Sequence, residues 1–249
     1  MNIGLYQSAS ALSALERWQD SVAQNITSSQ TTGFRKRTIN FSTQGAGELR
    51  ADPRRHNQTD TSMPMLFPKV NSGINFNTGE VHPTNRELDV AIQGEGFFEV
   101  QLQDGTKAYT RAGEFRLRPD RTLVNGSNHE VMSESGGPMT LVAGGGALVI
   151  NRDGSVFQGE TSLGKISVQK FANPAALIPI KDGYFVAAAE VEGERVGEPE
   201  LMQGYLENSN VTPLREMVDL VLISRAYEAN QKIITTVDQQ MEKTLEALG

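Results

Sequence analysis

The feature that most constrains the fold is the C-terminal stretch, residues 212–249. Thr212 is a favourable N-cap, Pro213 suits the first helical position, and no Pro or Gly follows before Gly249. Apolar residues recur there at steps of three and four, the spacing of a coiled-coil seam: Leu220, Ile223, Tyr227, Ile234, Val237, Met241, Leu245 and Leu248. We predict one helix of about 37 residues, spanning roughly 55 Å. An apolar stripe of that length needs a partner of similar length.

One polar residue, Asn230, fills the gap in this seam between Tyr227 and Ile234. A single amide in an apolar seam can simply be tolerated, or it can fix the register in which two helices pair. The sequence leaves both alternatives open.

A second seam lies near the N-terminus. Its positions are seven residues apart or interleave with that series: Leu5, Ser8, Leu12, Leu15, Gln19, Val22 and Ile26. The pattern fades over residues 25–32, and we predict Gly33 as the helix stop. Phe34 is expected to anchor the chain there, while the cations at 35–37 either stabilise the helix terminus or meet an acidic neighbour. The two seams favour pairing with each other, parallel or antiparallel, with the middle of the chain as an insertion.

The middle of the chain divides into two stretches that differ in apolar content and in period. Residues 38–68, including the stretch 52–58, have few apolar side chains and no period, which predicts an extended, partly mobile linker. From Val70 to about Met202 the pattern has period two. Turn signals such as Asp104-Gly105, and the same pair at 153–154 and 182–183, interrupt it. Many short strands with such turns indicate an antiparallel β domain.

The sequence therefore predicts an α+β fold, in which long terminal helices form a coiled-coil-like core with an inserted, mainly antiparallel β domain. We expect residues 1–35 with 212–249 to form the terminal helical domain. Residues 36–80 with 203–211 are expected to form an extended connecting region, and residues 81–202 the β domain.

Composition narrows the possible functions. The 249-residue chain has a net charge of −7 and no cysteine, which argues against a nucleic-acid binder and excludes disulfides and thiolate sites. His56, His82 and His129 lack metal-binding spacing, and the glycine-rich turns at 94–96 and 144–146 lack the strand-to-helix context of a phosphate site. We expect no catalytic residue, cofactor, metal or small-molecule substrate.

The sequence predicts neither a membrane span nor a cleavable signal peptide. No run is apolar and long enough to span a membrane, so we expect no membrane insertion. The first 14 residues lack the basic and apolar regions of a cleavable signal peptide, so export would need another route.

Three blocks of the chain, in order, resemble the bacterial flagellar rod and hook proteins. Residues 24–35 are similar to the family's Asn-Asn-Leu-Ala-Asn-x-x-Thr-x-Gly-Phe-Lys signature. Residues 88–98 and 109–115 are similar to its central LDVAI-x-G-x-GFF and YTR-x-G-x-F blocks, and residues 204–211 and 225–232 to its closing motif. The blocks cover most of the chain.

The first block departs from the family at four positions, where Gln24, Thr27, Ser28 and Gln30 replace commoner residues. In the middle, Arg121 stands where Asp-Gly is usual. Within the family, Tyr6 and residues 136–140 look most like a proximal-rod protein, with a distal-rod protein next.

The resemblance implies a structural, non-enzymatic subunit that polymerises through its terminal helices into the tubular drive shaft of the flagellar basal body, which transmits torque. Implied partners are other copies of the chain, other rod proteins and the flagellar type III export apparatus. The implied location is the periplasm-spanning rod, reached without a cleaved signal peptide. Predicted subunit-interface residues are Leu5, Leu12, Leu15, Val22, Ile26, Gly33, Phe34, Asn210, Leu220, Ile223, Tyr227, Asn230, Ile234, Val237, Met241 and Leu245.

Three alternatives stay open. One is a distal-rod or hook-type relative of the same family. Another is a secreted oligomeric adhesin that binds through its β domain, residues 70–202, and uses the helices only to oligomerise. A glycan-processing enzyme is disfavoured, because no acid pair lies in a cleft-forming context.

Overall fold

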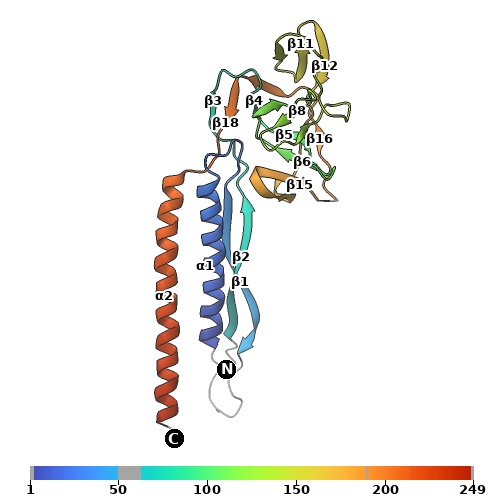
Figure 1. Ribbon diagram of the computed structural model, residues 1–249. Coiled ribbons are helices and arrows are strands. Elements are labelled where there is room, and N and C mark those ends of the chain that lie inside the picture. The colour runs from blue at the N-terminus through green and yellow to red at the C-terminus, as the bar shows by residue number, and fades with distance from the viewer. Residues whose placement is uncertain (1–2, 50–62, 189, 248–249) are drawn as a thin grey trace. The chain divides into compact units, whose positions relative to one another are not determined.

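The computed structural model describes residues 3–49, 63–188 and 190–247, which form two compact units (Figure 1). The first unit comprises Met1–Ile26, Arg37–Gly73 and Pro213–Gly249, and the second comprises Thr27–Lys36 and Ile74–Thr212. The chain therefore passes between the units four times.

The first unit contains both long helices and a two-stranded sheet. Its elements are α1 (Ile3–Thr27), β1 (Arg37–Leu49), β2 (Met63–Ile74) and α2 (Pro213–Glu246). Helix α2 begins at Pro213, as predicted, and runs for 34 residues. In Figure 1, α1 and α2 run antiparallel and α1 lies beside the β1–β2 pair.

The prediction of an extended linker over residues 38–68 is wrong for β1 and β2, which are regular strands. Ile39, Phe41 and Thr43 alternate with polar residues in β1, a period that a low apolar content concealed. Packing against α1 supports the strand, since the rings of Phe41 and Trp18 meet edge to face with centroids 5.5 Å apart. Residues 52–58 of the same prediction lie outside the described residues.

Gly33 is not the helix stop. Helix α1 ends at Thr27, and Gly33 follows in the second unit with φ of 67°. A Cβ placed on Gly33 would lie 2.3 Å from the carbonyl carbon of Arg111. Glycine is needed here because the backbone passes close to Arg111 in a left-handed conformation.

The second unit is built of short strands. They are β3 (Val81–Pro83), β4 (Val90–Gln93), β5 (Phe97–Gln101), β6 (Lys107–Thr110), β7 (Phe115–Leu117), β8 (Leu123–Asn125), β9 (Glu130–Val131), β10 (Leu148–Ile150), β11 (Ser155–Gln158), β12 (Thr161–Lys165), β13 (Val168–Lys170), β14 (Leu177–Pro179), β15 (Tyr184–Ala187), β16 (Glu194–Arg195), β17 (Glu200–Gln203) and β18 (Tyr205–Glu207), with 3₁₀ turns at Pro174–Ala176 and Lys181–Gly183. The largest sheet has the order β14-β15-β6-β5-β9-β8-β7, and β13 and β16 extend from it. The predicted α+β fold with a mainly antiparallel β part is confirmed.

The turn signals predict this unit well. Asp104-Gly105 joins the antiparallel strands β5 and β6, and the amide of Thr106 donates to the Asp104 carboxylate at 2.9 Å. Within the period-two region, residues 139–142 are expected to form one of the short strands, but they do not. Thr140 makes only an isolated bridge, while Met139, 1% exposed, points into the main core. Pro138 lacks an N–H and glycines follow at 144–146, so no ladder extends from this point.

Candidate assembly surfaces

Helices α1 and α2 contact each other through one apolar cluster. Leu15, Val22 and Ile223 are buried at its centre, with exposed fractions of 8%, 2% and 1%. Side chains that pack around them are Trp18, Ile26, Leu220, Ala226 and Tyr227. The two predicted seams therefore meet over the first half of α2, and pairing along the whole of both helices stays a prediction.

Burial decreases along the α2 seam toward the C-terminus. Asn230, Ile234 and Val237 are partly buried, whereas Met241 and Leu245 are 44% and 69% exposed. Leu5 and Leu12 on α1 are also partly buried, and Leu248 lies outside the described residues. The C-terminal end of the seam thus presents apolar side chains to the surroundings.

Several of the buried side chains of α1 are small or polar. Ser8, Ala14, Ser21 and Asn25 are all at most 8% exposed, whereas Gln19, a predicted seam position, is exposed. The small side chains suit close approach, because α1 packs on the strands as well as on α2. The sequence reading placed Ser8 in the seam, but it did not include Ala14, Ser21 or Asn25 and missed the contact with the strands.

Asn25 joins three elements of the first unit. Its amide nitrogen donates to the carbonyl of Arg37 and to the carboxylate of Glu216, both at 2.9 Å. Its amide oxygen accepts from the backbone N–H of Arg37 at 2.8 Å. Asn25 and Glu216 are each 1% exposed. One side chain thus fixes the end of α1, the start of β1 and the first turn of α2.

The other predicted interface residues lie in the second unit, where they hold the chain's own segments. Phe34 is 3% exposed, as expected of an anchor. The Asn210 amide donates to the carbonyls of Asn75 and Asn77, at 2.9 and 2.7 Å, and accepts from the N–H of Lys36 at 2.7 Å. A role for either residue in contacts between subunits stays a prediction.

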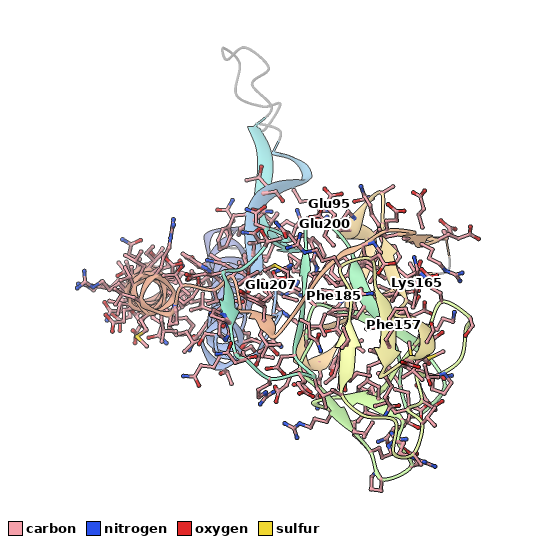
Figure 2. The ribbon with its side chains drawn as sticks, turned by 90° about the horizontal axis from the view of Figure 1, so that it is seen from above. Glu95, Phe157, Lys165, Phe185, Glu200 and Glu207 are labelled. Carbon is pink, nitrogen blue, oxygen red and sulfur yellow. The ribbon has the colours of Figure 1, made fainter. Side chains whose placement is uncertain are left out.

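A buried ion cluster lies beside them. Glu207, labelled in Figure 2, accepts from Arg35 through one carboxylate oxygen and from Arg111 through the other, at 3.2 Å. Burial lowers the pKa of Arg111 to about 10; the neighbouring Glu207 opposes this shift, and Arg35 adds to it. Of the three cations at residues 35–37, Arg35 pairs with an acidic residue of the same chain, Glu207.

Helix α2 carries a second apolar face that the sequence reading missed. We call it the outer patch: Leu214, Met217, Val218, Val221 and Leu222, which are 74%, 51%, 54%, 53% and 50% exposed. These residues follow the spacing i, i+3, i+4, i+7 and i+8 of a single helical face. At 100° per residue, this face lies opposite Ile223 and the seam. A search for a second stripe at period 3.6 would have found it.

Apolar surface on α2 does not make it a membrane helix. None of the helices in the described parts of the chain is apolar enough, over a sufficient length, to cross a bilayer.

Comparison with known proteins covers both units. The family description "Flagellar basal body rod FlgEFG protein C-terminal" matches residues 202–247, and "Flagellar hook protein FlgE/F/G D1 domain" matches residues 91–158. The flagellar basal-body rod protein FlgF of Caulobacter vibrioides is 31% identical over 251 residues, covering 100% of this chain and 99% of the relative. This chain belongs to the flagellar basal-body rod protein family. The rod proteins FlgG of Borreliella burgdorferi (32% identical, 95% of each chain) and of Bacillus subtilis (30%, 96% of each) are also similar.

Membership in the rod family assigns the chain to structural components of the flagellum. The outer patch and the described part of the α2 seam both fall within residues 202–247, the match to the rod C-terminal region. Arg111 and the central strands fall within residues 91–158, the match to the D1 domain.

Proposed function

We propose that this chain is a structural subunit of the flagellar basal-body rod, which polymerises through its terminal helices into a tubular shaft that transmits torque. The observation that carries the proposal is the apolar surface of α2, where residues such as Leu214, Val218 and Leu245 are at least half exposed. Contiguous exposed apolar surface is unfavourable in water, and its burial by a neighbour gains about 25 cal/mol per Å². A subunit built to polymerise carries such surface.

The predicted interface residues divide by position within this proposal. Leu15, Val22 and Ile223 hold the two helices of one chain together. Ile234 and Val237, partly buried in the single chain, continue the coiled-coil-like seam when neighbouring helices pack beside them. Other copies of the chain and other rod proteins are the proposed partners.

We propose further that the chain is of the FlgF type and belongs to the proximal rod. The FlgF proteins of C. vibrioides and Rhizobium meliloti both align with 100% of this chain and 99% of their own length. The FlgG relatives leave part of this chain outside the alignment, covering 95% in B. burgdorferi and 96% in B. subtilis. Identities of 28–32% do not separate the two types, so end-to-end agreement in length supports the assignment.

The proposed location is the periplasm-spanning rod, with delivery by the flagellar type III export apparatus. The test removes the chain from its bacterium and restores it in three forms: wild type, Ile223→Glu and Val149→Glu. Ile223 is 1% exposed between α1 and α2, whereas Val149, 47% exposed on β10, is the matched control. We expect wild type and Val149→Glu to restore motility and to be found in purified basal bodies, and Ile223→Glu to fail in both. Normal swimming without the chain, or its absence from basal bodies, would refute the proposal.

A further inference from the structure

Helix α2 carries two exposed apolar regions at opposite ends. One is the outer patch, centred near Val218. The other, which we call the end patch, comprises Val237, Met241 and Leu245 of the seam, with exposed fractions of 44% for Met241 and 69% for Leu245. About 23 residues separate the two centres, near Val218 and Met241, or about 35 Å along the axis at 1.5 Å per residue. At 100° per residue, the two patches point to opposite sides of the helix.

The exposed charges of α2 differ between the two ends. Over residues 213–232 they are Arg215, Arg225 and Lys232 against Glu228. Over residues 233–246 they are Asp238, Glu242 and Glu246 against Lys243. Asp219 is partly buried and Glu216 is buried, so the excess of cations in the segment that carries the outer patch holds for its exposed side chains, while the exposed side chains of the segment that carries the end patch have an excess of acids. Contact between unlike ends is attractive, whereas contact between two outer patches places cation-rich segments together.

Position and charge together select one kind of contact. Two outer patches facing each other would form an isologous pair that closes on itself and leaves both end patches exposed. Contact between an outer patch and an end patch uses different surfaces on the two copies, so each copy can bind one neighbour above and one below. Such a heterologous contact does not close, and a single repeated interface buries both patches.

Resting on the proposed rod function, we infer that the outer patch of one copy packs against the end patch of a second copy. The two α2 helices are parallel in this contact, and they are staggered by about 35 Å. The occupant of the outer patch is thus the C-terminal third of α2 from the next subunit.

Cross-linking tests the contact directly, because the chain has no cysteine of its own. Full-length chains carrying Val218→Cys or Leu245→Cys are purified and treated, separately and mixed, with a short bifunctional maleimide under conditions in which the wild type sediments as a polymer. We expect cross-linked dimers from the mixture, little from either variant alone, and a ladder of higher species from the double variant. Dimers from Val218→Cys alone would show an isologous contact and overturn the inference.

Substitution provides a second measurement. Val218→Glu and Leu245→Glu should each raise the critical concentration for assembly about tenfold or more. Ile233→Glu is the matched control: Ile233 lies on the same helix, is 52% exposed and belongs to neither patch. It should leave assembly unchanged, and circular dichroism checks that all three variants stay helical. Equal effects of the three variants would overturn the inference.

The outcomes separate this inference from the function on which it rests. A wild-type chain that polymerises, but whose 218–245 pair does not cross-link, refutes the patch contact and leaves the rod function intact. A chain that neither self-associates nor enters basal bodies refutes both.

Discussion

Asn25 offers the sharpest test of how the helical unit is held together. In Asn25→Ala, three hydrogen bonds of 2.8–2.9 Å are lost at a side chain that is 1% exposed. Each is worth about 1 kcal/mol net, so the variant should lose about 3 kcal/mol of unfolding free energy. That is a large part of the stability of an ordinary domain. The loss should fall on α2, because its first turn is attached through Glu216.

Asn25→Asp is the more informative change. It replaces the amide donor by a carboxylate, which would lie near the Glu216 carboxylate and the Arg37 carbonyl, the two acceptors that the amide reaches at 2.9 Å. Two buried acids this close cannot both stay ionised, so we expect a loss of about 4–5 kcal/mol at pH 7, more than for alanine. The folded-state pKa of the new carboxyl would be raised above its unfolded value. Stability should therefore be higher at low pH and fall as the pH rises.

The assay is urea unfolding followed by tryptophan fluorescence. Trp18 is the single tryptophan of the chain and lies in the helical unit against Phe41, so its emission reports this unit selectively. Gln19→Ala is the control. Gln19 is exposed and follows Trp18 in the chain, and its replacement should alter stability by less than about 0.5 kcal/mol. If Asn25→Asp were as stable as the wild type at pH 7, or no less stable than Asn25→Ala, the reasoning would be wrong.

Other predictions concern the second unit and can be checked by thermal unfolding. Glu207→Gln should destabilise by about 3–5 kcal/mol, because it leaves Arg35 and Arg111 buried without their counter-ion; a loss below about 1 kcal/mol would show that the cluster is not held by charge. Arg121 has φ of 67°, so Arg121→Gly should stabilise by up to about 1 kcal/mol, and a destabilised variant would contradict this. Burial raises the pKa of Glu99, but hydrogen bonds from its lysine, serine and glutamine partners outweigh it and leave the pKa lowered. The wild type should therefore lose stability as the pH falls below about 4.5. Glu99→Gln should lessen that acid loss, and an unchanged pH profile would count against the assignment.

The elements most accessible from sequence were those with a strong local signal. Pro213 at the first helical position and an apolar period of three and four, interrupted only at Asn230, predict α2 and its start. Asp104-Gly105 predicts the β5–β6 hairpin, and Gly105 supplies the left-handed residue of its loop, with φ of 83°. The seam residues Leu15, Val22 and Ile223 were also predicted, and they form the contact between α1 and α2.

Features that depend on a distant segment of the chain could not be predicted from the sequence. Strand β1 has few apolar side chains, so its alternation of Ile39, Phe41 and Thr43 is a weak local signal, and the packing of Phe41 against Trp18 of α1 is visible only in the fold. Gly33 reads as a helix stop, since only the fold shows that the backbone of Arg111 lies against it. The roles of Asn25 and Asn210 need partners more than a hundred residues away, Glu216 for one and Asn75 for the other.

The division of the chain also sets an order of folding. The second unit draws almost wholly on the continuous stretch Ile74–Thr212, whereas the first needs three separate stretches, the last of which is Pro213–Gly249. Closing the contact between Asn25 and Glu216 spans 191 residues, an entropic penalty of about 5 kcal/mol for a flexible chain. Folding of the intervening unit shortens that loop before it must close. A chain that emerges N-terminus first therefore completes its helical unit last, and its assembly surface forms only after the β unit has folded.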